Sequence, residues 1–255
     1  MKSVIYETKG RAREFNELAI NLFTGCDHAC VYCYGADVLH TDKAKFVNEP
    51  KERVTDTDVF NNAKEWVARG ETRRVLLCFI TDPYQKCEQA TQLTRKCIMR
   101  LHEVGLNVII LTKGGNRSIR DFDLLTSKDA YATTLTLTDD TQSLKWESGA
   151  GLPMERINAL KEAHKRGIET WVSFEPVIYP TETMKLVQLT KDFVDHYKVG
   201  TMNYHPQGKN TNWREYGWYM KRYMDSNNIK YYFKKDLLRE MGVLPENFNQ
   251  TWICK

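Results

Sequence analysis

Several features that mark other protein classes are missing from this 255-residue sequence. It contains no run of eighteen or more apolar residues, so no membrane-spanning helix is expected. Residues Met1–Glu7 lack the basic-then-apolar order of a signal peptide. No low-complexity segment marks a boundary between domains. We therefore expect one domain over residues 1–255, located in the cytoplasm and without a membrane partner.

A strong charge of one sign is also missing, because 37 lysines and arginines face 33 aspartates and glutamates, for a net charge of +4. So small an excess is compatible with a nucleic-acid partner but does not predict one by itself. The 42% hydrophobic and 11% aromatic content is sufficient for a packed core and excludes an extended disordered chain.

Cysteine is sparse outside one short segment. Three of the seven cysteines, Cys26, Cys30 and Cys33, lie within eight residues. In a cytosolic chain of this size, clustered cysteines indicate metal ligands or catalytic groups rather than a disulfide framework. The scattered cysteines are expected to be buried thiols unless another argument applies. They are Cys78, Cys87, Cys97 and Cys254.

Short apolar runs alternate with amphipathic stretches along most of the chain. Their lengths and β-branched content predict strands, and capping residues and glycine stops bound the helices between them. Repeated strand–helix–strand units predict a parallel α/β sheet, which we interpret as a partial (β/α)6-type barrel, with a doubly wound sheet as the alternative. In both folds the site is expected at the carboxyl ends of the strands. The expected strands are 18–23, 75–80, 107–112, 131–137, 170–174 and 198–203, and the expected helices are 56–69, 88–104, 153–166, 183–196 and 213–226.

The cysteine segment directly follows the first expected strand, in the loop where a barrel site would lie. The spacing Cys26-x3-Cys30-x2-Cys33 allows three thiolates to surround one face of an iron–sulfur cluster. No fourth cysteine lies nearby, so one iron would be open to another ligand. The alternative is a structural zinc site with His28 as the fourth ligand.

This spacing resembles the motif of the radical S-adenosylmethionine (SAM) superfamily, and Tyr32 provides the aromatic residue that is typical before the last cysteine. The resemblance implies a barrel of the radical SAM kind and a [4Fe–4S] cluster on Cys26, Cys30 and Cys33. It also implies that SAM binds the open iron and is cleaved to a 5′-deoxyadenosyl radical. The electron would come from an external reductant of the flavodoxin or ferredoxin type.

Further segments resemble the spore photoproduct lyase family over roughly the first half of the chain. Tyr34 directly follows the last cysteine, the segment from Cys78 to Asp82 is similar to that family's Cys-Thr-Ser-Asp, and Lys113 closes a similar Thr-Lys ending. The resemblance implies that Cys78 returns a hydrogen atom to the product radical, assisted by Tyr34. However, Cys78 precedes Asp82 by four residues rather than three. A one-residue shift in a strand turns a side chain to the opposite face, so a core thiol is the alternative.

Three charged residues at strand ends are candidates for holding SAM. Asp82 is expected to accept from its amine, and Lys113 to pair with its carboxylate. Glu175, after the fifth expected strand, is the candidate for the ribose hydroxyls. The alternative for Asp82 is a turn residue before Pro83. For Lys113 it is a solvated lysine at a strand end, and for Glu175 a buried carboxylate paired with the barrel wall.

The sequence from Trp213 onward interleaves aromatic residues with lysines and arginines, which is typical of nucleic-acid contact. Helical spacing assigns part of this set to a packed face instead. Residues 204–209 are expected to edge the cavity, and the segment 204–255 to face the substrate or cap the barrel. We expect a lyase-like enzyme that acts on a nucleic-acid lesion or modified nucleotide. The alternatives are a radical SAM enzyme for a peptide or small metabolite, and a non-catalytic iron–sulfur or zinc protein that binds nucleic acid.

Overall fold

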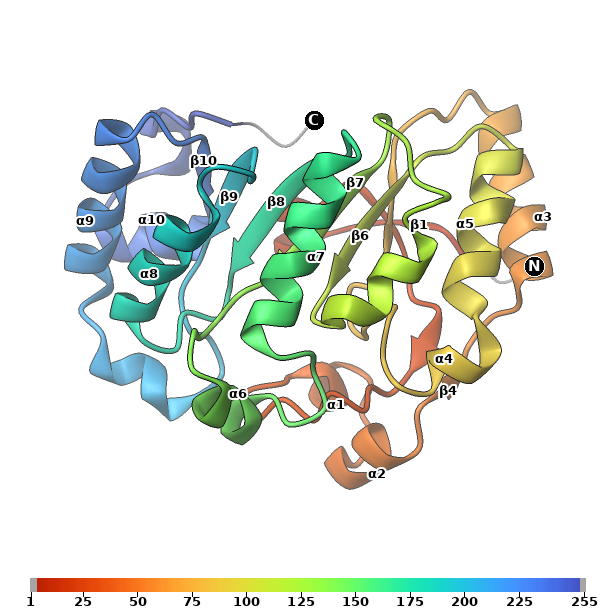
Figure 1. Ribbon diagram of the computed structural model, residues 1–255, viewed down its shortest axis with the longest axis horizontal. Coiled ribbons are helices and arrows are strands. Elements are labelled where there is room, and N and C mark those ends of the chain that lie inside the picture. The colour runs from red at the N-terminus through yellow and green to blue at the C-terminus, as the bar shows by residue number, and fades with distance from the viewer. Residues whose placement is uncertain (1–3, 253–255) are drawn as a thin grey trace.

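The computed structural model describes residues 4–252, so Met1–Ser3 and the predicted buried thiol Cys254 lie outside the described residues. One long sheet with helices packed on one face dominates the described chain (Figure 1). Its strands run in the order β1-β2-β5-β6-β7-β8-β9-β10, and all neighbours are parallel except β1 and β2. The end strands do not pair with each other within residues 4–252, so the barrel is open. The predicted α/β partial barrel is confirmed.

Strands are short throughout. The long sheet consists of β1 (Tyr6–Glu7), β2 (Leu18–Ile20), β5 (Val75–Leu77), β6 (Val108–Thr112), β7 (Ala130–Thr134), β8 (Glu169–Phe174), β9 (His196–Val199) and β10 (Tyr231–Phe233). A separate two-stranded antiparallel sheet pairs β3 (Phe23–Thr24) with β4 (Lys51–Glu52).

All six expected strands are present, as β2 and β5 to β9. Four of the six end three or four residues earlier than expected, because the chain turns there into the loops of the carboxyl edge. The sequence interpretation missed β10, whose residues were taken as part of a basic and aromatic surface. Pairing with β9 makes β10 the last strand of the sheet.

The helices follow the expected order with several differences. Helices over Asp140–Trp146 and Lys235–Met241 were not expected, and the expected helix 183–196 lies at Pro180–Thr190, because His196 already begins β9. The expected helix 88–104 is divided at Gln92, whose left-handed φ of 52° interrupts the helical hydrogen bonds. The connection after Tyr34, expected to carry one helix, contains two further short helices. The α-helices are α1 (Gly35–Val38), α2 (Lys43–Asn48), α3 (Asp56–Ala68), α4 (Glu88–Thr91), α5 (Leu93–Glu103), α6 (Asp140–Trp146), α7 (Pro153–Lys165), α8 (Pro180–Thr190), α9 (Trp213–Ser226) and α10 (Lys235–Met241). The 3₁₀ helices are η1 (Gly10–Glu14), η2 (Gly115–Asp121), η3 (Pro206–Asn210) and η4 (Pro245–Asn247).

The two faces of the sheet bury different sets of side chains, as the period of two along a strand requires. On β7, Tyr131 belongs to the core beneath the helices, while Ala130 and Ala132 face the opposite, concave side. Three of the seven buried residues on that side are alanines, and the rings of Phe15 and Trp171 fill the space beside them. The lower part of the concave face is therefore packed with side chains.

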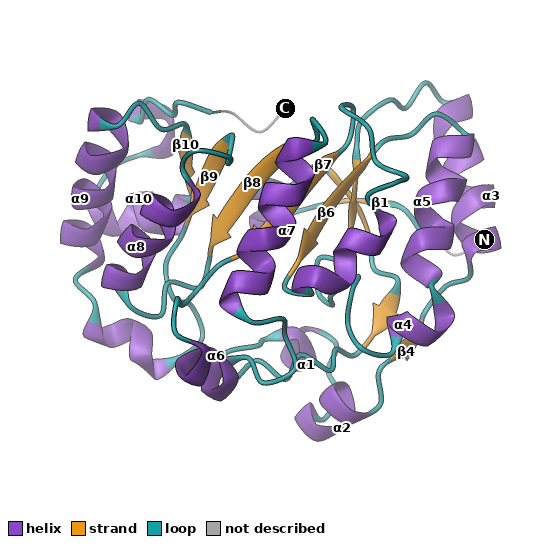
Figure 2. Cartoon of the chain, in the orientation of Figure 1, coloured by secondary structure: helices purple, strands orange, loops and turns teal. Residues whose placement is uncertain are grey.

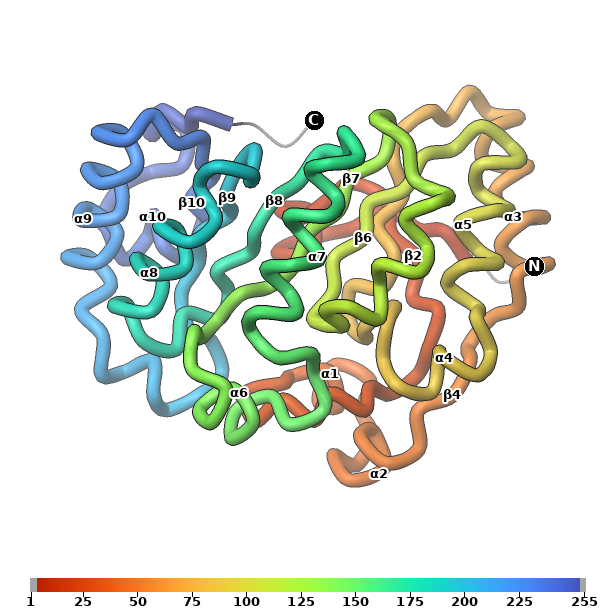
Figure 3. Tube along the Cα trace, viewed as in Figure 1, coloured from red at the N-terminus to blue at the C-terminus, as the bar shows by residue number. Residues whose placement is uncertain are grey.

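The N-terminal segment lies across this concave face, behind the central strands in the view of Figure 3. The ammonium of Lys198 on β9 donates to the carbonyls of Glu14 (3.0 Å) and Phe15 (2.8 Å). Glu14 also accepts from the backbone N–H of Lys235 at 2.7 Å. These contacts hold η1 against the last strands, so it forms part of the wall above the sheet.

The carboxyl ends of the parallel strands meet at one edge, along which α1 and α6 lie (Figure 2). This edge is formed by the loops after β2, β5, β6, β7 and β8, and it positions the site. No helix within residues 4–252 combines the length and apolar character needed to span a membrane.

Candidate active site

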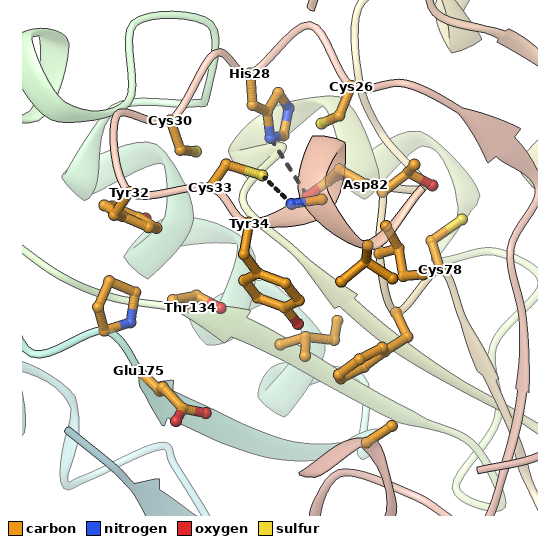
Figure 4. Close-up of a pocket in the computed structure, with 18 of the residues that line it drawn as sticks. Cys26, His28, Cys30, Tyr32, Cys33, Tyr34, Cys78, Asp82, Thr134 and Glu175 are labelled. Atoms are coloured by element: carbon orange, nitrogen blue, oxygen red, sulfur yellow. Dashed lines mark hydrogen bonds and ion pairs between the residues drawn. The ribbon is translucent and has the colours of Figure 1, made fainter. Parts of the chain in front are cut away.

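A cavity of about 590 Å³ opens at the carboxyl edge of the sheet. We call it the cysteine cavity, because the three clustered cysteines border it. The structure brings every site residue predicted from the sequence to this one cavity. These residues are Cys26, Cys30, Tyr32, Cys33, Tyr34, Cys78, Asp82, Lys113 and Glu175. Figure 4 labels all of them except Lys113.

The cysteine loop is held from two sides by backbone contacts. The N–H of Cys26 donates to the carbonyl of Phe46 on α2 at 2.9 Å. Opposite, the carbonyl of His28 accepts from the N–H of Gly149 at 3.0 Å. A side chain at Gly149 would lie 2.0 Å from the carbonyl of Asp27, so only glycine permits this close approach. The loop conformation is therefore set by its neighbours as well as by its own sequence.

The arrangement of the thiols does not match a single-metal site. Among residues 4–252, no group of three or more His, Cys, Asp or Glu side chains is placed to hold one metal ion. A tetrahedral zinc with Zn–S bonds of about 2.3 Å requires sulfurs about 3.8 Å apart. A cluster provides a separate iron for each thiolate, so its ligands do not converge on a point. Three cysteines that border one cavity without converging on a point are therefore consistent with an iron–sulfur cluster.

His28, the alternative fourth zinc ligand, has both ring nitrogens engaged. Arg117 donates to its Nε2 at 2.9 Å, which assigns the ring proton to Nδ1. Nδ1 lies 3.4 Å from Oδ2 of Asp82. Burial lowers the pKa of His28 to about 4, so the ring is neutral near pH 7. The zinc alternative is not supported.

Asp82 borders the cavity, but its carboxylate is occupied by the surrounding chain. Oδ1 accepts from the hydroxyl of Thr112 (2.6 Å) and the N–H of Tyr84 (2.8 Å). Oδ2 accepts from the N–H of Lys113 at 2.7 Å and faces His28. Burial favours the neutral acid, but these contacts outweigh it and lower the pKa of Asp82. Asp82 thus connects the ends of β5 and β6, and the turn at Pro83 is part of its role.

Lys113 is half-buried at the cavity wall. Its ammonium lies 5.7 Å from the centre of the Tyr32 ring and forms no ion pair within residues 4–252. Burial opposes its charge, but Cys30 and Glu147 outweigh burial and raise the pKa of Lys113. The cavity therefore contains a fixed positive charge available to a ligand.

Glu147 and Arg156 were missed by sequence reasoning. Both are 1% exposed and form an ion pair of 2.6 Å behind Tyr32, whose hydroxyl donates to Glu147. Neither residue belongs to a motif or directly follows a strand, so the sequence carried no signal for them beyond their charge.

Glu175 borders the cavity on the far side from the cysteine loop (Figure 4). It forms an ion pair with Lys234, a 2%-exposed residue just after β10. Its other oxygen accepts from the amide of Asn203 at 3.2 Å. The pairing with the barrel wall that was the alternative for Glu175 is present, and acceptor positions of the carboxylate remain for a ligand.

Tyr34 and Tyr204 form the outer part of the cavity. Their ring centres are 5.3 Å apart, and the guanidinium of Arg11 lies 5.0 Å from the Tyr204 ring. Burial, with a further contribution from Glu175, raises the pKa of Tyr34, so its hydroxyl is protonated near pH 7. Of the residues 204–209, only Tyr204 borders this cavity, while His205, Pro206, Gly208 and Lys209 border the adjoining one. That second cavity, of about 750 Å³, shares Arg11, Asn203 and Tyr204 with the first.

Cys78 borders the cavity, while its sulfur accepts from the N–H of Leu22 at 3.5 Å. The sulfur is turned away from the Tyr34 ring in Figure 4. Cys78 follows the last residue of β5 and has a left-handed φ of 61°, so the strand alternation is broken there. Burial raises the pKa of this thiol to about 12. Its role as hydrogen donor stays a prediction.

Most of the predicted basic and aromatic surface is packed instead. Tyr231 and Phe233 are fully buried on β10, so a nucleic acid cannot contact these rings. On α9, Trp218 packs against the core and Lys221 pairs with Asp225 at 2.6 Å. This part of the expectation is wrong, because the apolar rings are required by the last strand and helix of the barrel.

The sequence is similar to one family model and to several uncharacterized proteins. Residues 20–194 match the family model described as the radical SAM superfamily, which is more than half of the chain. An uncharacterized protein of Methanocaldococcus jannaschii is 25% identical over 188 residues, covering 72% of this chain and 70% of that protein. An uncharacterized protein of Mycobacterium tuberculosis is 28% identical over 167 residues, covering 62% of this chain and 49% of that protein.

Solved structures show the same fold. The structure of Streptococcus suis SuiB bound to the precursor peptide SuiA superposes with a TM-score of 0.68 at 13% identity over 88% of this chain. A spore photoproduct lyase mutant with bound SAM and dinucleoside spore photoproduct gives 0.60 at 17% identity over 80% of this chain. The chain spans 50% of SuiB and 62% of the lyase. At these identities the likeness concerns the fold alone.

Proposed function

The chain belongs to the radical SAM superfamily, and from this membership we propose that it is an enzyme that abstracts hydrogen from a substrate at the mouth of the cysteine cavity. The cofactors of the family are a [4Fe–4S] cluster and SAM, and a SuiB structure of the same fold is bound to SAM. Such an enzyme also requires a one-electron reductant and a substrate. The observation that supports the proposal is the meeting of all three clustered cysteines with one cavity at the carboxyl edge.

We assign Cys26, Cys30 and Cys33 as the ligands of the cluster. When bound, the reduced cluster supplies the electron that cleaves SAM to methionine and a 5′-deoxyadenosyl radical. Lys113 would pair with the carboxylate of SAM, because its ammonium faces the cavity beside Tyr32 and forms no ion pair within residues 4–252.

Asp82 and Glu175 take different parts in this assignment. The acceptor positions of Asp82 are filled by four neighbours, so we propose that it supports SAM through the backbone of Lys113. Glu175 keeps free acceptor positions, and its charge is held by Lys234, so it would accept from the ribose hydroxyls.

The substrate class we propose is a nucleic-acid lesion or modified nucleotide. The support comes from the rim, where the ring of the exposed Tyr204 lies at a tilt beside that of Tyr34 and Arg11 lies over the Tyr204 ring. Lys9 borders the first cavity and Lys209 the second, and neither forms an ion pair within the described chain. Stacking rings beside free cations suit bases and phosphates. Of the two tyrosines, Tyr34 is the more buried, so we assign to it the role of assisting hydrogen transfer.

Anaerobic reconstitution followed by reduction in the presence of SAM tests the enzyme class. We expect about four irons per chain and release of 5′-deoxyadenosine. Stoichiometric zinc, or a cluster that never yields 5′-deoxyadenosine, would contradict the proposal. Adding single-stranded oligonucleotides containing damaged or modified bases, and separately peptides, then tests the substrate class. Stimulated 5′-deoxyadenosine release with peptides alone would remove the nucleic-acid assignment and keep the enzyme class.

A further inference from the structure

A buried charge network lies behind the cysteine cavity without bordering it. Arg156 on α7 is fixed by its Nε–H, which donates to the carbonyl of Gly151 at 2.7 Å, and by Nη1, which donates to the carbonyl of Thr134 at 3.2 Å. It pairs with Glu147 at 2.6 Å, and Thr136 donates to the same carboxylate at 3.0 Å. Both charges are therefore held by β7 and the loops next to it.

Glu147 reaches the cysteine loop at two points, once through its backbone and once through its carboxylate. The backbone of Glu147 forms an isolated antiparallel bridge with Cys30, next to a hydrogen bond of 2.9 Å from Val31 N–H to the carbonyl of Trp146. Its side chain accepts from the hydroxyl of Tyr32, the ring of which borders the cavity. The network thus fixes a residue between two of the clustered cysteines.

The third connection is to Lys113. Its carbonyl accepts from the N–H of Gly151 at 2.7 Å, and Gly151 is also a partner of Arg156. Its ammonium lies over the face of the Tyr32 ring, where the negative π-face stabilises a cation. The position of that ring therefore depends on Glu147, and the position of the ammonium depends on the ring.

Stability alone does not explain such a pair. An ion pair at 1% exposure contributes little more than apolar residues of similar volume would, because both charges lose their hydration. The ion pair instead fixes the position of the Glu147 carboxylate, which holds Tyr32, and Tyr32 borders the cysteine cavity.

We propose that Glu147 is a positioning residue, with Arg156 as its counterion, that holds Tyr32 and through it Lys113 for SAM. This inference rests on the proposed function, because SAM is the ligand that Lys113 is assigned to meet. Neither residue touches the cavity, so their effect on SAM is indirect.

The test uses the reconstituted full chain and three variants. Glu147→Gln keeps the shape of the side chain and removes its charge, and Tyr32→Phe removes only the hydroxyl that Glu147 holds. Glu182→Gln is the matched control, since Glu182 also accepts from a hydroxyl, that of Thr138, and pairs with a cation, Lys185, without bordering either cavity. The readouts are iron content, SAM affinity by calorimetry, the change that SAM causes in the electron paramagnetic resonance spectrum of the reduced cluster, and the melting temperature.

We expect Glu147→Gln to keep its iron and to lose SAM affinity by at most about ten- to a hundredfold, the loss that removal of the charge-assisted Lys113 contact itself would cause. Tyr32→Phe should move in the same direction by a smaller factor, and Glu182→Gln should bind SAM like the parent. A lower melting temperature with unchanged SAM affinity and an unchanged spectral response would reduce the network to a structural role. If Glu147→Gln does not fold, parent-like SAM affinity of Tyr32→Phe overturns the inference. Failure of the parent to bind SAM at all would instead contradict the proposed function.

Discussion

Residues 20–194, which match the family model, and residues 195–252 contribute to the site in different ways. The first region supplies the three cysteines, Lys113 and Glu175, each in a loop directly after a strand. The second region supplies Tyr204 at the rim and Lys234 behind the wall. A cluster requires ligands at a fixed spacing, whereas a substrate is met by loops that follow no common spacing. The residues of the cofactor site can therefore be predicted from the sequence, whereas the residues that recognise the substrate are much harder to predict.

Among the variants that test this comparison, the largest effect is expected from a substitution in the cysteine loop, which should remove the cluster. Cys30→Ala should abolish the brown colour of the anaerobically purified protein and reduce its iron from about four per chain to near zero. The reason is that the loop offers only three thiolates. Iron analysis and the visible spectrum measure the change, and Cys87→Ala is the control, because Cys87 borders neither cavity. Full iron in Cys30→Ala would remove the loop from the cofactor site.

The second prediction concerns the packing of the C-terminal region. Phe233 is fully buried on β10, with its ring 5.4 Å from that of Phe248. Phe233→Ala should lower the free energy of unfolding by about 3–5 kcal/mol, since it leaves a cavity in the core. Denaturant titration measures this change, with the exposed Arg222→Ala as the control. Unchanged stability together with lost nucleic-acid binding would instead support the prediction that Phe233 belongs to an exposed surface that contacts nucleic acid.

The third prediction addresses the charge at the cavity wall. Lys113→Ala should retain the cluster and weaken SAM binding by about ten- to a hundredfold, since a charge-assisted contact contributes about 1.5–3 kcal/mol. Asp82→Ala should weaken it too, because the Lys113 backbone loses its acceptor. Calorimetry with SAM gives the affinities, and Lys145→Ala on the exposed side of α6 provides the control. Parent-like affinity in both variants would show that SAM lies elsewhere.

Particular residues show what could be predicted and why. The cysteines, Asp82, Lys113 and Glu175 follow strands whose apolar runs are evident, so parallel pairing alone brings them to one edge. Glu147 could not be found this way, because it lies after α6 and reaches Tyr32 only through the folded backbone. Likewise, no pattern indicated that η1 forms a wall of the cavity, since its contacts come from β9 and from residues 232–235.

The C-terminal strand was missed for a related reason. Tyr231-Tyr232-Phe233 lies between Lys230 and Lys234, and its composition resembles that of a nucleic-acid surface. Burial separates the two readings, because the ammonium of Lys234 is paired with Glu175 inside the molecule. A three-residue strand has too little periodicity to be recognised without its neighbour β9.

The smallest effect is expected for Cys78, where the resemblance and the geometry diverge. A hydrogen donor must direct its thiol to the cavity, whereas the sulfur of Cys78 faces the N–H of Leu22. The left-handed φ of 61° just after β5 accounts for this, since it breaks the alternation of side chains at Cys78. Cys78→Ala should therefore cost about 1 kcal/mol of unfolding free energy.

Cys97→Ala is the matched control for this last variant, because Cys97 on α5 is a fully buried thiol of the same core and does not border the cavity. Both variants should keep the cluster, release 5′-deoxyadenosine like the parent and give its products from whichever substrate stimulates that release. Product analysis by mass spectrometry, together with denaturant titration, decides between the two interpretations. Side products from Cys78→Ala alone would mean that the thiol turns from Leu22 into the cavity during turnover. Its place in the wall would then describe only the resting enzyme, and the lyase resemblance would extend to hydrogen return.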